Sequence, residues 1–211
     1  MIENEDFDDN SKNLSKKKHQ TIKISNGLHE KVNRSNLREV PNLWPGNCFG
    51  CSPHNDYGLK MRIYMSEKGC FSRLTVTDEY CGFDGIVHGG IIATILDEIA
   101  AWTLIIRLQK LGVTQEATIH YFKLVVTNIP VIAEGHIIAQ GDKMVLVKAS
   151  IKSIEDELLA ESESKWLIPD LNMLAKLTGK DLKLIKKMFE QFIDPIKRAR
   201  EYNPPNKIKN Y

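Results

Sequence analysis

The chain has 211 residues, of which 42% are hydrophobic and 27% are charged. This composition is typical of a globular protein with enough apolar residues for a sizeable core. The formal net charge is only +2, so the charge gives no reason to expect a nucleic-acid partner.

Residues 1–40 are expected to form a flexible charged arm. Acidic residues gather at 3–9 and basic residues at 12–23, without a sustained hydrophobic period. Such charge blocks are typical of solvated tails. Because the chain opens on acidic and polar residues, we expect neither a secretory signal nor a transit peptide, and a cytoplasmic location.

Four cysteines follow, at positions 48, 51, 70 and 81. Cys48 and Cys51 have the spacing of a zinc knuckle or a redox pair. A structural zinc site needs four ligands, and the sequence has no second pair, although His54 lies close by and the segment could in principle supply three ligands. We therefore expect free structural thiols in a reducing compartment and no bound metal.

Two strands are predicted next, at 58–64 and 71–77, because apolar and polar residues alternate there. Phe71, Leu74 and Val76 are the expected inward residues of the second strand. A glycine-rich connection at 82–85 then leads to the longest apolar segment of the chain.

This segment, from His88 to about Gln109, is predicted to be a helix buried on nearly all sides. Its central acids, Asp97 and Glu98, argue against a membrane span. An acid on an apolar helix is costly unless it faces a partner or a site. Asp97 shares its stripe with small residues, which leave room for a ligand: Gly90, Ala93, Thr94, Ala100 and Ala101. Asp97 is therefore the leading candidate for a catalytic acid, with Glu98 as the alternative.

Four more strands are predicted at 118–126, 131–139, 144–154 and 158–168, joined as a meander by short turns. The chain should thus form an α+β domain over residues 41–169, in which a curved antiparallel sheet of about six strands wraps round one long central helix.

Residues 170–211 are expected to form a basic helical extension with a disordered end after Tyr202. A single amphipathic helix is predicted from about Leu171 to Phe192. Its apolar face comprises Leu174, Leu177, Leu184, Ile185, Met188 and Phe192, and its basic face comprises Lys176, Lys180, Lys183, Lys186 and Lys187.

The run from Val87 to Glu98 resembles a known signature. His88-Gly89-Gly90, followed by Asp97 seven residues after the second glycine, is similar to the motif of the phenylacetic-acid-degradation (PaaI-like) branch of hotdog thioesterases. Flanking segments at 47–59, 114–123, 141–143 and 158–161 resemble other parts of that family, and the likeness covers roughly residues 44–168. The resemblance implies a hotdog fold and hydrolysis of an acyl-CoA to a carboxylic acid and CoA.

Chemical roles follow for the signature residues. Two glycines that open a helix leave backbone N–H groups unpaired, so Gly89 and Gly90 are expected to bind the substrate carbonyl as an oxyanion site. Asp97 is expected to act as base or nucleophile. His88 is expected to hold the glycine loop or contact the thioester, or else to cap the helix. No cofactor is expected, because CoA is part of the substrate.

Asp97 lies about 10 Å along the helix axis from Gly90, by the rise of 1.5 Å per residue, which is too far for direct cooperation within one helix. The resemblance implies a homodimer or homotetramer in which the partner completes the site. Thr114 is then the residue contributed across the interface, with Thr118 as its competitor. Lys123 is the candidate for coenzyme contacts, where related proteins often carry an Arg-Pro pair.

Two other functions compete with the thioesterase. A hotdog dehydratase or hydratase would need a different histidine motif, which the sequence lacks. A non-catalytic acyl-CoA-binding regulator or scaffold would gain little from Asp97. The acyl chain, and the choice between CoA and carrier-protein thioesters, are not predicted.

Overall fold

The computed structural model describes residues 38–43 and 46–201. By its internal contacts the chain divides into Met1–Asn36 and Leu37–Tyr211, and every described residue belongs to the second unit. The expected flexible arm, up to residue 37, and the expected disordered end from Tyr202 both lie outside the described residues.

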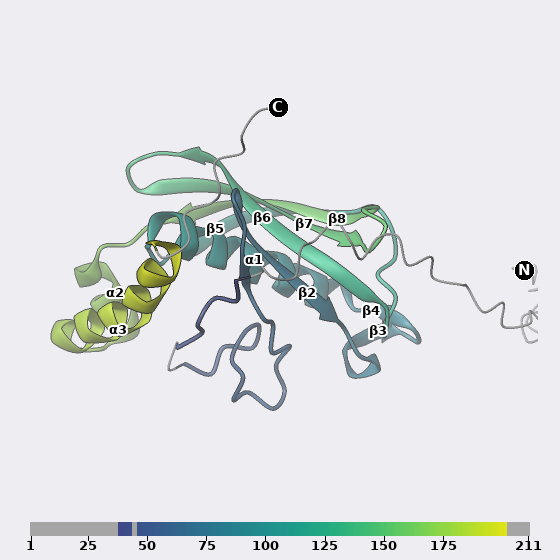
Figure 1. Cartoon of the computed structure of the whole chain (residues 1–211), viewed down its shortest axis with the longest axis horizontal. Helices are drawn as coiled ribbons and strands as arrows, with labels where there is room; N and C mark the ends of the chain where they lie inside the picture. Colours follow the sequence, from purple (N-terminus) through teal and green to yellow (C-terminus); the bar gives the residue numbers. More distant parts are fainter. Residues whose placement is uncertain (1–37, 44–45, 202–211) are drawn as a thin grey trace, which may run out of the picture. The chain divides into compact units, whose positions relative to one another are not determined.

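A six-stranded antiparallel sheet forms the body of this unit, in the order β1-β2-β6-β7-β8-β5 (Figure 1). The strands are β1 (Tyr64–Met65), β2 (Gly69–Thr75), β5 (Val113–Tyr121), β6 (Pro130–Gln140), β7 (Met144–Ser153) and β8 (Leu158–Leu167). One long helix, α1 (Gly89–Leu108), packs against β2, β6, β7 and β8. The predicted α+β class, with about six strands and one central helix, is confirmed.

The strand order differs from the predicted meander at β5. β6, β7 and β8 pair in sequence, but β5 pairs with β8, and the other neighbour of β6 is β2. After α1 the chain therefore reaches the far edge of the sheet instead of continuing beside β6. β5 also covers 113–121 and not 118–126, because the chain leaves the sheet after Tyr121.

The central helix is confirmed almost to the residue. Ile95, Leu96 and Ile99 are fully buried. The helix lies so close to β6 that a Cβ on Gly135 would stand 2.4 Å from Thr103 Oγ1, so this strand position needs glycine. Although α1 is long, none of the helices among the described residues is both long and apolar enough to cross a membrane.

The first predicted strands are partly wrong. Residues 59–63 keep the expected alternation, with Met61 and Ile63 buried, but only Tyr64 and Met65 are strand. The Met61 N–H donates to Gly50 O instead, so this backbone pairs with the cysteine segment. Leu74 packs against the core and Val76 is buried, as predicted, together with Cys70 and Ser72. Phe71 does not point inward, and it stacks on Tyr64 at a ring-centroid distance of 5.3 Å.

A small second sheet was not predicted. β3 (Cys81–Phe83) and β4 (Ile86–Val87) form an antiparallel pair across the glycine-rich turn, which follows the short 3-10 helix η3 (Asp78–Tyr80). Gly85 has φ +78, a left-handed conformation that favours glycine and closes the turn.

The folded region begins earlier than the predicted boundary at residue 41. Glu39 bridges to Tyr64, and the Val40 N–H donates to Ile63 O at 2.8 Å. Val40 is only 3% exposed and belongs to the core. Residues 38–40 therefore belong to the domain and not to the arm.

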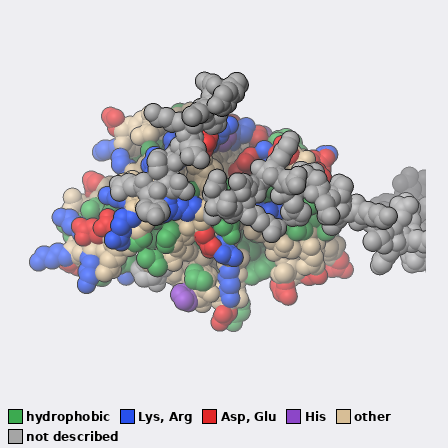
Figure 2. Space-filling view, viewed as in Figure 1, with side chains coloured by type: hydrophobic (Ala, Val, Ile, Leu, Met, Phe, Trp, Pro, Cys, Tyr) green, Lys and Arg blue, Asp and Glu red, His purple; other side chains and the backbone are tan. Residues whose placement is uncertain are grey.

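The helical extension consists of two helices, α2 (Leu171–Thr178) and α3 (Leu182–Glu201), so the prediction of one helix ending at Phe192 is wrong. Gly179 has φ +64 and caps α2, which breaks the helix there. Leu177 and Leu184 are 59% and 45% exposed, contrary to the predicted apolar face. The predicted lysine face is exposed, and basic side chains are visible on this extension in Figure 2.

α3 docks against α1. Phe192 meets Trp102 edge-on, with ring centroids 5.6 Å apart. The Arg200 guanidinium donates to the carbonyls of Ile106 and Arg107 at 3.3 and 3.1 Å. These carbonyls lie in the last turn of α1, where backbone acceptors have no partner within the helix.

Candidate functional site

His88 caps the N-terminus of α1. Its backbone is extended, and its Nδ1 accepts a hydrogen bond from the Gly90 N–H at 2.9 Å. The His88 N–H donates to Tyr80 O at 2.9 Å, which fixes the residue from the other side. The expectation that both glycine N–H groups are unpaired is therefore wrong for Gly90, and the capping interpretation of His88 is correct.

Gly89 and Gly90 stand in different surroundings. A Cβ on Gly90 would lie 3.1 Å from His88 Nδ1, so the imidazole leaves little space there. At Gly89 the nearest atom would be Tyr121 Cε1 at 3.8 Å, an ordinary contact. The Gly89 N–H belongs to the first turn, whose donors have no partner within the helix. Gly89 is thus the donor that the helix end can offer to a ligand.

An open cavity of about 350 Å³ lies beside this helix end. Its lining residues are Glu79, Tyr80, Cys81, His88, Gly90 and Ile91. Two of the five predicted catalytic residues, His88 and Gly90, therefore face the same space. Asp97 does not line it.

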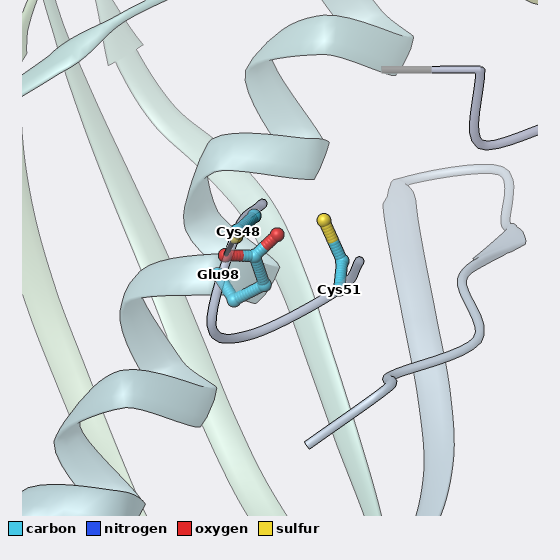
Figure 3. Close-up of side chains that lie close together, drawn as sticks. All are labelled: Cys48, Cys51 and Glu98. Carbon is cyan, nitrogen blue, oxygen red and sulfur yellow. Dashed lines mark hydrogen bonds between the residues drawn. The ribbon is translucent and has the colours of Figure 1, made fainter. Parts of the chain in front are cut away.

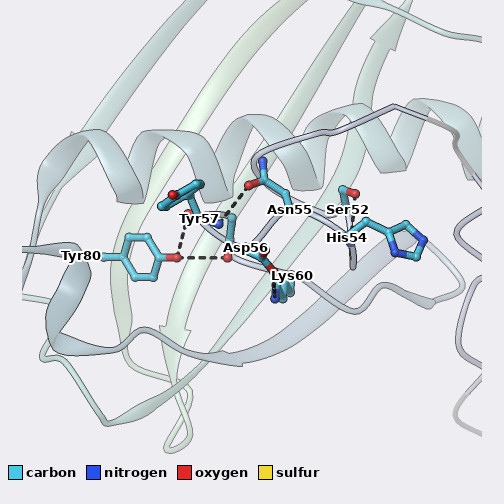
Figure 4. A network of polar contacts seen from close by, with 8 residues as sticks. Ser52, His54, Asn55, Asp56, Tyr57, Lys60 and Tyr80 are labelled. Carbon is cyan, nitrogen blue, oxygen red and sulfur yellow. Dashed lines mark hydrogen bonds and ion pairs between the residues drawn. The ribbon is translucent and has the colours of Figure 1, made fainter.

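Tyr80 joins the cavity to the loop that follows the cysteines. Its hydroxyl donates to the carbonyls of Tyr57 and Gly58 at 2.9 and 3.0 Å (Figure 4). Within the loop, the Tyr57 N–H donates to Asn55 Oδ1 at 3.0 Å. Tyr80 thus holds the loop through its side-chain hydroxyl and His88 through its backbone carbonyl.

Asp97 meets Thr114 within one chain. The Thr114 hydroxyl donates to Asp97 Oδ1 at 2.7 Å. The ladder of β5 and β8 shifts register between Thr114 and Glu116, and such a bulge re-aims the side chains beside it. The expectation that Thr114 reaches Asp97 from a partner subunit is therefore wrong for this contact. Thr118, its competitor, lies opposite Glu163 in the same ladder.

The environment of Asp97 makes its carboxylate a stronger base than an ordinary aspartate. The residue is exposed as a whole, but neighbouring atoms crowd its carboxyl group, and the lost hydration raises its pKa. The Thr114 hydrogen bond lowers the pKa and opposes this effect in part. A carboxylate with a raised pKa accepts a proton more readily.

Lys123 is paired with a carboxylate. Its ammonium group contacts Glu157 Oε1, and both side chains are about half exposed. A coenzyme phosphate that binds Lys123 would have to compete with Glu157 in a solvated position.

Glu98 lies in a different place from Asp97. Its carboxylate is next to Cys48 and Cys51, and the ligand atoms of the three residues all lie within 4.8 Å of one another (Figure 3). Cys48 Sγ donates to Glu98 Oε2 at 3.3 Å, and Trp102 Nε1 donates to Glu98 Oε1 at 2.9 Å. The exposed His54, which the sequence suggested as a ligand, is not part of this cluster.

The cluster shifts the pKa values of its members. Burial raises the pKa of Glu98 to about 7. The hydrogen bond with Cys51 lowers the pKa of Cys48 to about 5, and the same bond is the main reason that the pKa of Cys51 is raised. Sequence spacing could not reveal this cluster, because Glu98 comes from α1 and the thiols come from a loop far earlier in the chain.

Comparisons with known proteins agree with this fold. Residues 84–160 match the family model described as "Thioesterase superfamily". No curated protein matches the chain in a sequence comparison.

Three solved structures illustrate the likeness in fold. A protein from the thioesterase superfamily has a TM-score of 0.50 at 22% identity, over 56% of this chain and 90% of that one. A second protein of that superfamily has a TM-score of 0.52 at 20% identity, over 55% of this chain and only 57% of its own. Zebrafish thioesterase superfamily member 2 has a TM-score of 0.51 at 18% identity, over 56% of this chain and 88% of that one.

The family match contains His88, Gly89, Gly90, Asp97 and Thr114, and it spans the helix and the strand that carry them. The described domain therefore has a hotdog fold, and its segment 84–160 is similar to the thioesterase superfamily.

Proposed function

We propose that the protein hydrolyses an acyl-CoA thioester, with the Asp97 carboxylate as the catalytic base or nucleophile. The observation that carries this proposal is the hydrogen bond from Thr114 to Asp97, made on the central helix of a thioesterase fold. The bond orients the carboxylate, while the loss of hydration raises its pKa. A base needs both a fixed position and a suitable pKa.

As a base, Asp97 takes a proton from water, and the hydroxide attacks the thioester carbonyl carbon. The carbonyl oxygen becomes an oxyanion, for which the Gly89 N–H and the positive end of the helix dipole are the donors. The C–S bond then breaks, and the proton returns from Asp97 to the CoA sulfur. As a nucleophile, Asp97 would instead form an anhydride that water cleaves. Neither route needs a cofactor besides the CoA of the substrate.

We propose that a second subunit completes the site. Asp97 stands eight helical positions after Gly89, which corresponds to about 12 Å along the axis. One chain cannot place Gly89 and its own Asp97 on the same carbonyl group. We therefore propose a homodimer, alone or paired as a tetramer, in which Gly89 acts together with the partner subunit's Asp97. The unpaired edge of β5 is the surface that supports this pairing.

Asp97→Asn tests the proposal, because asparagine keeps the size and loses the base. Turnover of a series of acyl-CoA substrates, followed by free-thiol release, should fall by about 10²- to 10⁴-fold. Binding of a non-hydrolysable acyl-CoA should persist, since Gly89 is unchanged.

Glu98→Gln is the matched control. Both variants are assayed with a chelator present, because Glu98, Cys48 and Cys51 are close enough together to hold a metal ion. The Glu98→Gln variant should stay within a few-fold of wild type, since Glu98 faces the thiols. Loss of turnover in Glu98→Gln alone would move the base to Glu98. Ligand binding without turnover in the wild type would favour the non-catalytic acyl-CoA-binding protein.

A further inference from the structure

We propose that Cys48, Cys51 and Glu98 form a binding site for a thiophilic divalent cation, with zinc as the best fit. The site does not depend on the proposed thioesterase activity. The sequence-based expectation of no metal rested on the lack of further ligands near the cysteine pair, and α1 supplies one.

The donor set suits zinc. Two thiolates and one carboxylate are standard ligands of this ion, and three protein ligands leave a fourth position for water. Tetrahedral ligands at the usual zinc–sulfur and zinc–oxygen distances lie about 3.5 Å apart. Cys48 Sγ and Glu98 Oε2 are 3.3 Å apart. The three ligand atoms all lie within 4.8 Å of one another, so a small inward movement would close the site.

The carboxylate is already oriented for such a role. Trp102 Nε1 donates to Glu98 Oε1, which leaves Oε2 toward Cys48. Groups that hold a metal ligand by its second atom fix the geometry of the first. Trp102 is 2% exposed, so it is itself held by the core.

Glycine at position 50 keeps the loop against the helix. A Cβ there would stand 2.5 Å from Glu98 Oε2 and 2.7 Å from Glu98 Cδ, well inside contact distance. The loop is held by its own hydrogen bonds, from the Ser52 N–H to Cys48 O and from the Leu59 N–H to Phe49 O. Loop and helix thus present their ligands to one point.

The charges of the cluster also call for a cation. Among the described residues, the polar partners of Glu98 are Cys48, Cys51 and Trp102, and none of them carries a positive charge. None of the ion pairs found in the described part of the chain includes Glu98. A half-buried carboxylate beside two thiols is costly without a counter-charge. A divalent ion would displace the protons and neutralise most of the charge.

The test uses the full chain, reduced and stripped of metal by a chelator. Titration with Co²⁺ should give one ion per chain, with the charge-transfer absorption of cobalt–thiolate bonds and the visible bands of a tetrahedral site. Zn²⁺ should bleach both signals and raise the melting temperature.

Cys48→Ser and Glu98→Gln should each weaken Co²⁺ binding by at least about tenfold, and zinc should no longer raise their melting temperature. Cys81→Ser is the matched control, because Cys81 is also a half-buried free cysteine but lies outside the cluster. It should bind Co²⁺ as the wild type does. If Cys48→Ser does not fold, Glu98→Gln carries the test alone, since it keeps both thiols. Substoichiometric binding to the reduced wild type, or equal losses in Cys81→Ser and Cys48→Ser, would overturn the proposal.

Discussion

Thr114 and Asp97 form the contact on which the proposed hydrolysis depends, and their hydrogen bond has a consequence for the pH profile. The bond lowers the pKa of Asp97, whereas the loss of hydration raises it. Thr114→Val removes only the lowering effect, so the pKa should rise further. A base works when deprotonated, so the acidic limb of kcat/KM should move to higher pH.

Thr114→Ser keeps the hydroxyl and is the control, and its acidic limb should stay at the wild-type pH. Both profiles are to be recorded with a chelator present, so that any charge at Cys48, which also raises the Asp97 pKa, is the same in each variant. A limb that moves to lower pH in Thr114→Val would contradict the assignment of Asp97 as the base.

Individual residues show where sequence reasoning succeeds. The apolar run after His88 predicted the central helix, because a helical pattern depends only on neighbours along the chain. The contact of Glu98 with Cys48 was missed, since it depends on how a loop folds back onto α1. The sequence offered His88 as a helix cap only as an alternative, so the loss of the Gly90 N–H as a free donor to His88 Nδ1 was not predicted.

At the scale of elements, α3 depends on a few large contacts. Phe192 is 2% exposed and packs on Trp102, while Leu177, in the neighbouring α2, is 59% exposed. Phe192→Ala should lower the free energy of unfolding by about 3–5 kcal/mol, as removal of a buried aromatic ring does. Leu177→Ala should change it by less than about 0.5 kcal/mol.

Urea denaturation measures both values. A loss for Phe192→Ala no larger than that for Leu177→Ala would show that α3 is not docked in solution. The sequence pattern predicted an amphipathic extension. Ile185 and Phe192 of its predicted apolar face are buried, but Leu177 and Leu184 are exposed. The break at Gly179 changes the helical phase, so that residues before and after it no longer share one face.

β2 shows the same limit of periodicity. Alternation predicted the strand, but its apolar outer residue Phe71 was taken for a core residue. The residues that face α1 are Cys70 and Ser72, because the helix lies too close for large side chains there. Cys70 Sγ is 3.4 Å from the carbonyl oxygen of Ile99. Close packing thus selects small residues, which a hydrophobicity pattern does not recognise.

For the whole molecule, the exposed edge of β5 indicates that two copies of the chain assemble. Within the part of the chain that the structure describes, β5 pairs with β8 on one side only, and most of its residues are exposed. An unpaired edge of nine residues offers backbone groups to a second copy. Ala117 lies near the middle of β5, so in a two-fold pairing it approaches its own symmetry mate.

Ala117→Asp should therefore place like charges opposite each other and shift the protein toward monomer. Gln140→Asp, at the exposed end of β6, is the control and should leave the assembly intact. Sedimentation velocity at micromolar protein distinguishes the two. A wild-type protein that is monomeric and fully active would contradict both the dimer and the shared site.

The sheet order also determines when each strand can pair during synthesis. Val113–Tyr121 emerges before its partner Leu158–Leu167, with the whole β6–β7 hairpin between them. Contacts between distant segments form slowly, because the intervening loop must close first. Until β8 arrives, both edges of β5 stay open to water and to other nascent chains. The strand that we expect to join two finished subunits is thus also the segment most in need of protection while the chain is being made.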